Sequence, residues 1–430
     1  MRPLEVAILG AGSRGFSAYG EFALRHPHLM KCVAVAEPED AKRARFGDAH
    51  GIPHSLRFRT WQELVAARPP ATVIFNCLQD ALHAESAIAV MRAGYHQLLE
   101  KPMATTPHDC VRVVRAARAT GRILAICHVL RYAPFFQTLK EILTARVVGD
   151  VVTVVHIENV AFWHQAHSFV RGRWRRRDES SPMILAKSCH DLDLLVYLIG
   201  RRPLRLSSFG ALTWFRRENA PKGAAERCLD GCPVEPICPY SVQKNYLGGD
   251  RPGWIKDSDH VTIDKTLEGK LAALRAGPFG RCVWKCDNDV VDHQVVNIEF
   301  EGGTTAMFLM HAFAAENTRT MRYGCTRGEI KGHAGRNELR VTHFADGRED
   351  VIHPGQIAGG HGGGDVAMVR QFVEAITTGD PARMLTNVEV SLESHLLAFA
   401  AEESRLNHGR VVDMNAYRQR IEEEVARDER

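Results

Sequence analysis

The sequence lacks any unbroken apolar run that approaches the ~20 residues a helix needs to span a membrane. It also lacks a basic leader followed by a hydrophobic stretch and a small-residue cleavage site. A strong excess of one charge is missing as well, because 55 basic residues stand against 51 acidic ones, and overall charge therefore gives no reason to expect nucleic-acid binding. We therefore expect a cytoplasmic protein with no membrane partner and no nucleic-acid partner.

Disulfide bonds are not expected, because the cysteines are odd in number and several lie in apolar or helical patterns where a reduced thiol behaves as a small hydrophobic group. Other cysteines cluster in the Pro/Gly-rich segment CLDGCPVEPICPY and in a short run further along. Close thiols on irregular backbone in a reducing compartment favour a structural zinc, with a set of free thiols as the alternative. The expected zinc ligands are Cys228, Cys232 and Cys238 with either Cys286 or Cys282.

The chain of 430 residues is long enough for two domains, and its patterns predict an α/β fold. Residues 1–130 alternate strand and helix patterns, which is typical of a parallel sheet wound on both faces. Residues 131–412 carry longer alternating runs, which predict an α+β domain with a large, open, mostly antiparallel sheet and a cysteine-rich insertion at about 214–258. The charged tail, 413–430, is expected to be helical and weakly anchored, and Asp365 is expected to cap the helix after the GGHGGGD loop.

The run VAILGAGSRG, from Val6 to Gly15, leads a hydrophobic strand through three glycines into the start of a helix. Gly10 permits a tight turn, Gly12 lets a ligand approach bare backbone, and Gly15 lets the helix pack closely on the strand. The N–H groups and the dipole of the helix then face an anion, so the turn predicts a pyrophosphate site. The alternative is a glycine turn in an α/β domain that binds no ligand.

A second apolar segment, CVAVAE, ends at Glu37, roughly 20 residues beyond the glycines, where an acid binds the adenosine ribose hydroxyls. A carboxylate there would repel a 2′-phosphate, which favours NAD over NADP as the cofactor. Arg14, Lys42 and Arg43 lie close enough in sequence to leave dual use open. The cofactor-binding candidates from this part of the chain are Gly10, Gly12, Ser13, Arg14, Gly15 and Glu37.

The segment LLEKPMA places Glu100, Lys101 and Pro102 at the carboxyl end of the fourth long strand pattern, where a doubly wound sheet presents residues to its ligand crevice. The proline restricts the backbone, so the Lys101 ammonium is held in a defined direction, and a cis peptide is compatible with the sequence. A lysine beside a nicotinamide can donate to a sugar hydroxyl or polarise a developing alkoxide. The alternative is a surface lysine at a strand end.

The segment PMILAKSCHDLDLLVYL brings a lysine, a histidine and two aspartates together at the start of a helix. Helical spacing would let Lys187 pair with Asp191, while His190 and Asp193 share a side. Histidine titrates near neutrality, as a base that removes a hydroxyl proton during hydride transfer must. We interpret Lys187, His190 and Asp193 as a proton-transfer set, and a capped helix start with ordinary ion pairs is the alternative.

With these motifs in hand, the chain resembles the Gfo/Idh/MocA oxidoreductase family over nearly its whole length, in the glycine turn, NCLQDALH, EKP and the histidine-bearing helix. The resemblance implies an N-terminal Rossmann domain, catalytic roles for Lys101 and His190, and assembly as a homodimer or homotetramer through the open sheet. It also implies that the cofactor is bordered by Asn76, Leu78, His83, Glu100 and Lys101.

One position departs from that resemblance, because the family commonly has Asp four residues before the histidine and this chain has Ala186 there. Lys187 follows directly and could supply a second cation, with Asp193 or Asp191 taking over the orienting role. The family's usual Lys-Asp-His trio is therefore incomplete.

A third segment, HIENVAFWHQAHSFVRGRWRRRDESS, mixes histidines and arginines with tryptophans, which suits a sugar. Arg171 or Arg173 could grip an anionic group of such a sugar, whereas the alternative is a solvated loop or a subunit contact. The substrate-binding candidates are Arg131, Trp163, His164, His167, Arg171 and Asp191.

Three functions follow. The leading one is an NAD-dependent enzyme that acts on a sugar, sugar derivative or glycoside by hydride transfer at a ring carbon bearing a hydroxyl. The second is a redox-neutral NAD-dependent glycosidase that oxidises, eliminates the aglycone, adds water and returns the hydride. The third is a non-catalytic NAD-binding sensor, which the missing acid at position 186 would favour.

Overall fold

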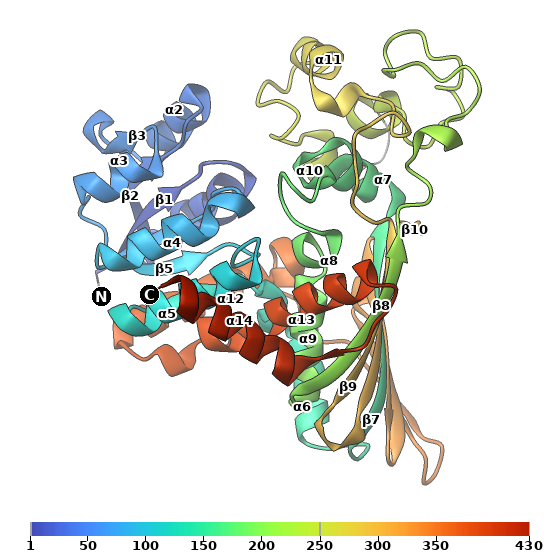
Figure 1. Cartoon of the computed structure of the whole chain (residues 1–430). Coiled ribbons are helices and arrows are strands. Elements are labelled where there is room, and N and C mark those ends of the chain that lie inside the picture. Colours follow the sequence, from blue (N-terminus) through green and yellow to red (C-terminus); the bar gives the residue numbers. More distant parts are fainter. Residues whose placement is uncertain (1, 249–250, 430) are drawn as a thin grey trace.

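The computed structural model describes residues 2–248 and 251–429, which form two sheets with helices packed against them (Figure 1). The first sheet has six parallel strands in the order β3-β2-β1-β4-β5-β6, as the alternating pattern predicted. The strand order reverses between β1 and β4, and in such sheets ligands bind at the carboxyl ends beside this reversal. The strands are β1 (Leu4–Leu9), β2 (Met30–Ala36), β3 (Arg57–Phe58), β4 (Val73–Asn76), β5 (His96–Leu99) and β6 (Leu124–Ile126).

Helices cover both faces of this sheet, because its central strands are apolar on both sides and must be buried on both. In β1, Val6 to Leu9 are fully buried. The flanking helices are α1 (Glu21–Arg25), α2 (Asp40–Ala49), α3 (Trp61–Ala67), α4 (His83–Arg92) and α5 (Pro107–Thr120).

The second sheet has nine strands in the order β14-β13-β12-β11-β7-β10-β9-β8-β15. All its neighbours pair antiparallel except β7 and β10, which confirms the expected open and mostly antiparallel sheet. The strands are β7 (Val151–Ala161), β8 (Pro203–Ala211), β9 (His293–Phe300), β10 (Thr305–Ala314), β11 (Thr318–Cys325), β12 (Gly328–His333), β13 (Glu338–His343), β14 (Glu349–Ile352) and β15 (Val412–Asp413).

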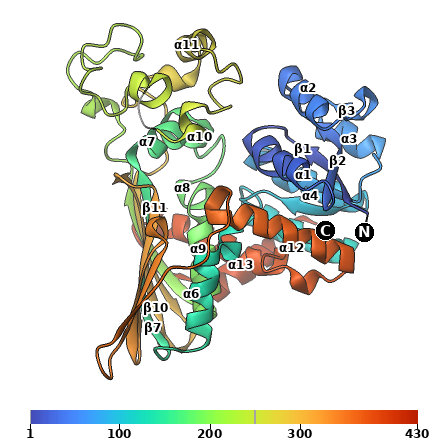
Figure 2. The same ribbon diagram turned by 180° about the vertical axis from the view of Figure 1, so that it is seen from behind.

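Helices that follow residue 130 lie between the two sheets (Figures 1 and 2), and three of them, α9, α13 and α14, contact strands of the nine-stranded sheet. The helices are α6 (Pro134–Thr144), α8 (Met183–Ala186), α9 (Cys189–Ile199), α12 (Gly364–Thr378), α13 (Val388–Leu406) and α14 (Met414–Asp428). The apolar face of α12 packs instead into the core of the first sheet, where Phe372 contacts Phe75. Both α13 and α14 also pack on α5, so the chain returns across the boundary between its halves.

The expectation of a weakly anchored tail is wrong. The tail forms α14, and Met414, Tyr417, Ile421 and Val425 of that helix are all buried in the largest apolar cluster. Their spacing of three or four residues places them on one helix face, which the charged composition of the segment concealed.

The insertion lies between β8 and β9 and stands above the second sheet (Figure 1). It carries the short helices α10 (Gly253–Lys256) and α11 (Leu267–Ala276), and it packs against α7 (Phe162–Gln165). Among the described residues, no helix is both long and apolar enough to cross a lipid bilayer.

Candidate active site

Of the three glycines in the turn, only Gly12 could carry a side-chain Cβ without meeting other protein atoms. A Cβ at Gly10 would lie 2.6 Å from the carbonyl oxygen of Cys77, and a Cβ at Gly15 would lie 1.9 Å from that of Gly10. Gly10 also has a φ of +85°. A Cβ at Gly12, by contrast, would meet no protein atom within 4 Å. Gly12 therefore leaves an open cradle of bare backbone, which fits the pyrophosphate of a dinucleotide.

Glu37 lies beside this turn, directly after β2. Its Oε2 accepts the N–H of Ala11 at 2.8 Å, and its Oε1 accepts the N–H of Glu39 at 3.0 Å. These bonds fix the carboxylate beside the glycine turn, and its binding of a ribose diol stays a prediction.

Arg14 is held by two carboxylates of the protein. Its guanidinium contacts Glu100 at 2.6 Å and Asp365 at 2.9 Å. Burial works to lower the pKa of Arg14, but the Glu100, Tyr19 and Asp365 partners raise it well above its usual value. Arg14 is therefore engaged by carboxylates and does not offer itself to a 2′-phosphate.

The expected cap at Asp365 is wrong, because α12 begins after Gly363 without a side-chain cap. The Asp365 carboxylate instead binds Arg14 and approaches the ring of His361 at 3.2 Å. These contacts tie the GGHGGGD loop to the glycine turn, so this loop borders the cofactor crevice. The position of His361 in a glycine-rich loop was the only signal for it in the sequence.

The remaining cofactor candidates follow β4 and β5. Asn76 is buried and donates to Ser86 at 2.7 Å. The two ring nitrogens of His83 lie 2.6 Å from the carbonyl oxygen of Pro102 and 3.1 Å from that of Leu78. His83 therefore joins the ends of the two strands and positions Leu78 and the EKP segment.

Lys101 is partly buried, and its peptide bond to Pro102 is cis. Its Nζ donates to the carbonyl oxygen of Ala186 at 2.7 Å. Ala186 ends α8 and occupies the position where the family commonly has aspartate. A backbone carbonyl therefore holds the ammonium there, and this bond brings the end of β5 against the segment that carries His190.

His190 lies on the first turn of α9, and its Nδ1 is buried without a hydrogen-bond partner in the described part of the chain. Burial lowers the pKa of His190 well below 6.5, and the charge of Lys101 acts in the same direction. The ring is thus neutral at physiological pH, and its unpaired nitrogen can accept a hydrogen bond.

The predicted pairing of Lys187 with Asp191 is wrong, because α8 ends at Ala186, Lys187 follows it, and the next helix begins only at Cys189. Lys187 instead contacts Glu158 of β7 at 2.9 Å, and Glu158 contacts Arg319 of β11 at 2.5 Å. Arg319 also binds Asp191 at 2.7 Å. Burial lowers the pKa of Lys187, although Glu158 opposes the shift. Arg319 was missed, because in sequence it reads as an ordinary strand residue.

Asp193 does not contact His190 directly. Its carboxylate forms a bidentate pair with Arg131, at 2.7 and 2.8 Å, and both side chains are buried. His128 lies 3.8 Å from Asp193, and its ring packs on that of His190. We therefore interpret Asp193 and Arg131 as positioning residues behind the His190 ring.

Only part of the aromatic segment reaches this cluster. His164 is partly exposed, its Nδ1 lies 2.8 Å from Asn317, and burial together with Lys187 lowers its pKa well below 6.5. Trp163 and His167 are buried in the insertion core, where His167 bonds Tyr246 at 3.0 Å. The Arg171 guanidinium is buried and donates to the backbone carbonyls of Arg281 and Tyr240. His164 thus remains a substrate candidate, whereas the structure places Trp163, His167 and Arg171 inside the insertion.

The expected zinc site is not supported. Residues 2–248 and 251–429 contain no group of three or more Cys, His, Asp or Glu side chains placed to hold a metal ion, and the cysteines are free. Burial raises the pKa of Cys238, Cys282 and Cys286, which disfavours the thiolates that zinc needs. Cys228, Cys232, Cys238 and Cys282 do line one small cavity, but Cys286 is not among its lining residues.

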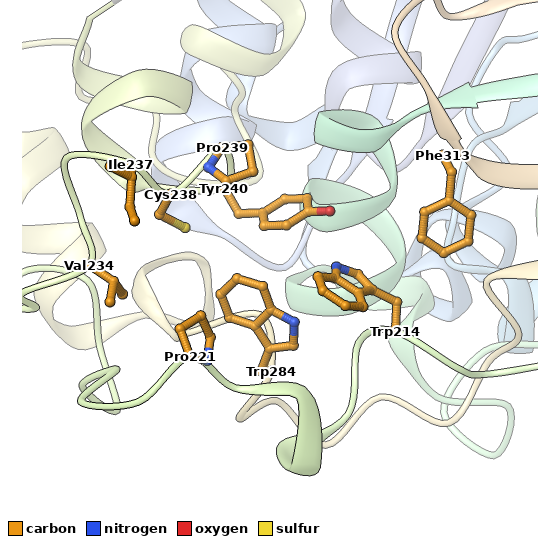
Figure 3. A pocket seen from close by; sticks show the side chains of 9 residues that line it. All are labelled: Trp214, Pro221, Val234, Ile237, Cys238, Pro239, Tyr240, Trp284 and Phe313. Carbon is orange, nitrogen blue, oxygen red and sulfur yellow. The ribbon is translucent and has the colours of Figure 1, made fainter.

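A larger cavity of about 480 Å³ lies in the insertion (Figure 3). It is walled by aromatic rings, including those of Trp214, Tyr240, Trp284 and Phe313. None of its lining residues is charged, and none belongs to the Lys101 cluster. The cavity therefore belongs to the apolar packing of the insertion rather than to the active site.

Comparison with known families agrees with this arrangement. The model of the oxidoreductase family with an NAD-binding Rossmann fold matches residues 4–128, and that of its C-terminal alpha/beta domain matches residues 140–413. The chain belongs to the Gfo/Idh/MocA oxidoreductase family. The two matches also agree with the division of the chain seen in the two sheets.

Individual relatives are distant. YteT of Bacillus subtilis (strain 168), provisionally named an oxidoreductase, is 25% identical over 391 residues, which are 85% of this chain and 88% of that protein. The NADP-dependent scyllo-inositol 2-dehydrogenase IolW of the same organism is 25% identical over 64% of this chain and 72% of its own. The crystal structure of an inositol dehydrogenase homologue from Azotobacter vinelandii with NAD+ has a TM-score of 0.70 at 15% identity, covering 96% of this chain and 97% of that one.

Acidification below pH 6.5 is expected to weaken the fold through the buried histidines. Burial is the main cause that lowers the pKa of His128 and of His167 to about 3. Between these values and 6.5, the unfolded chain binds protons that the folded chain does not, so the free energy of unfolding falls as the pH drops. At about pH 4.5 each histidine should cost about 3 kcal/mol. Urea unfolding across this pH range measures how the free energy of unfolding depends on pH. H128Q should reduce that dependence by the equivalent of about one bound proton.

Proposed function

We propose that the protein is an NAD-dependent oxidoreductase that transfers hydride from a hydroxyl-bearing carbon of a sugar, sugar derivative or glycoside. The observation that carries the proposal is the 2.7 Å bond from Lys101 Nζ to the carbonyl oxygen of Ala186. This bond places an ammonium from the Rossmann sheet beside the helix start that carries the neutral His190 ring. Relatives that include an inositol dehydrogenase support a polyhydroxylated substrate.

The bound cofactor would supply a nicotinamide ring that accepts the hydride. Lys101 would donate a hydrogen bond to the substrate oxygen and stabilise the charge that develops there. His190 would accept the hydroxyl proton on its ring, which its lowered pKa keeps unprotonated. In the reverse direction the protonated ring would return the same proton.

The charges around Lys101 favour a substrate that carries a carboxylate or another anionic group. Lys101, Lys187 and Arg319 contribute three positive charges, and Glu158 and Asp191 contribute two negative ones. Glu100 lies next to Lys101 but is paired with Arg14. Arg131 and Asp193 neutralise each other. The anion-binding role first assigned to Arg171 or Arg173 therefore passes to Lys101 and Lys187 in this proposal.

A second candidate is the redox-neutral cleavage of a glycoside, and Lys187 with His164 favours it. Burial lowers the pKa of Lys187, and burial together with the charge of Lys187 lowers the pKa of His164 and keeps its ring neutral. The site therefore holds a second acid and a second base. Elimination needs one group to remove a proton beside the oxidised carbon and another to protonate the departing aglycone. Water addition and return of the hydride would then leave only hydrolysis as the net reaction.

One assay separates these reactions from the third hypothesis. The protein is incubated with NAD and a panel of neutral sugars, sugar acids and their nitrophenyl glycosides, while reduced nicotinamide and nitrophenolate are followed together. Accumulation of NADH is the result expected for the dehydrogenase, and release of nitrophenolate without NADH is the result expected for the glycosidase. Bound NAD with neither product, and with no conversion of any sugar across the panel, would favour the sensor and contradict both enzymatic functions.

We further propose a cofactor preference and an oligomeric assembly. Glu37, together with an Arg14 that is engaged by carboxylates, supports a preference for NAD over NADP. The face of the nine-stranded sheet that α9, α13 and α14 leave uncovered supports assembly as a homodimer or homotetramer (Figures 1 and 2).

A further inference from the structure

Two contacts join residues that follow the Rossmann domain to that domain, on either side of the proposed cofactor site. The first is between Arg45 of α2 and Asp259 of the insertion, at 2.7 Å. Asp259 is 14% exposed and also binds Lys265 at 2.7 Å. Because α2 follows Glu37 directly, this contact lies at the end of the crevice that takes the adenosine ribose.

The guanidinium of Arg45 also lies 4.3 Å from the centre of the Phe16 ring. Phe16 belongs to the helical segment that follows the glycine turn. Arg45 is therefore fixed between the pyrophosphate-binding turn and the insertion, and it couples the two.

The second contact is at Asp80, which follows β4 and the cofactor candidates Asn76 and Leu78. Its Oδ2 accepts hydrogen bonds from Trp174 Nε1 and from Ser180 Oγ, both at 3.0 Å. Asp80 is buried, so its carboxylate depends on these donors for the hydrogen bonds that water would otherwise supply. This contact lies toward the nicotinamide end of the crevice, because Asn76 and Lys101 end neighbouring strands.

The two contacts form one continuous bridge. His260 follows Asp259, and its ring packs edge-on against Trp174 with 6.1 Å between the centroids. The bridge therefore runs from Arg45 through residues 259–260 and Trp174 to Asp80. Between its two ends lie the carboxyl ends of β2, β1 and β4, where a dinucleotide on the glycine turn would sit.

We propose that Asp259, His260 and Trp174 form a strap that retains NAD through successive turnovers, so that the cofactor acts as a resident group. The inference rests on the proposed hydride-transfer function and deepens it. A hydride taken from one hydroxyl-bearing carbon cannot leave with the cofactor, so it must be returned to a carbonyl carbon in the same site while the carbonyl oxygen takes up a proton. That carbonyl belongs either to the oxidised substrate itself or to a second carbonyl compound, and the overall reaction is redox-neutral.

The rate at which NAD leaves the protein measures the effect of the strap and requires no turnover. The purified full-length protein is loaded with NAD, passed through a desalting column, and sampled over time for protein-bound nucleotide. We expect near-stoichiometric NAD after desalting and a release half-time far longer than a turnover. D259A and W174F should each speed release by roughly tenfold or more, because tenfold corresponds to only about 1.4 kcal/mol. W174F keeps an aromatic side chain, although a smaller one, and removes the N–H donor to Asp80.

The matched control is D257N. Asp257 pairs with Lys270 inside the insertion, at 2.6 Å, and does not bind the Rossmann domain in that pair. Its variant should release NAD at the wild-type rate, and thermal unfolding should confirm that all the variants are folded.

The outcomes separate the strap from the proposed function. If wild type binds NAD but loses it on desalting as fast as D259A does, the strap is overturned while hydride transfer stands. If D257N speeds release as much as D259A and W174F, the effect is a general loosening of the insertion and the strap is again overturned. If the wild-type protein binds no NAD at all, the proposed function fails with it.

Discussion

Replacing Lys101 by methionine is expected to lower kcat/KM by ~10²–10⁴-fold, the range typical of losing a positioned acid–base group. Methionine keeps the length and apolar body of the side chain but removes the ammonium that faces Ala186 and the substrate oxygen. NAD affinity should stay close to that of wild type, because in the proposed site the glycine turn and Glu37 hold the nucleotide. Single-turnover hydride transfer and equilibrium NAD binding measure the two effects separately.

Lys140 supplies a matched control for this substitution. Its Nζ also donates to a backbone carbonyl at 2.7 Å, that of Tyr197, but on α6 and away from the crevice. K140M should therefore keep wild-type turnover even if it loses some stability. Equal losses of turnover in K101M and K140M, or full activity in K101M, would contradict a catalytic role for Lys101.

Two glycines of the same turn are expected to respond in opposite ways to alanine. G15A should destabilise the fold severely, because its Cβ would stand 1.9 Å from the backbone oxygen of Gly10, which cannot move aside cheaply. G12A should leave the melting temperature unchanged, because its Cβ meets nothing within 4 Å, yet it should weaken NAD binding by roughly tenfold or more. Thermal unfolding and equilibrium NAD titration distinguish the two effects.

Gly355 provides the control for G12A, because a Cβ there also meets no atom within 4 Å. G355A should bind NAD as wild type does. Unchanged NAD affinity in G12A would show that the dinucleotide does not approach this part of the backbone, and the cofactor assignment would then have to be abandoned.

Features that depend on neighbours along the chain could be predicted from the sequence. The strands of the first sheet are recognisable as short apolar runs in the sequence. The turn from Gly10 to Gly15 could be predicted from the backbone conformations and close approaches that each glycine permits. Lys101 was identifiable because it follows the carboxyl end of a strand, and the carboxyl ends of the strands in a doubly wound sheet border the ligand crevice. His190 was identifiable because its helix start resembles that of a known family.

Side-chain partners were harder to predict, because ion pairs form between elements far apart in sequence. Local helical spacing suggested that Lys187 pairs with Asp191, but a break after α8 turns Lys187 toward Glu158 on β7. Asp365 was expected to cap its own helix and instead binds Arg14, 351 residues away. The histidines and arginine near Trp163 looked like one substrate-binding group, yet only His164 faces the Lys101 cluster.

The sequence by itself determined the two-sheet architecture, the glycine turn and the choice of Lys101 and His190 as catalytic candidates, because periodicity and backbone restrictions act over a few residues. Only the tertiary structure decided which charges compensate one another, which cysteines and aromatic residues are merely packed, and that Asp259 and Trp174 contact the Rossmann domain. The physical reason is that a buried charge must find a partner wherever the fold supplies one. In this protein, the decisive partners come from strands and loops that the order of residues along the chain does not bring together.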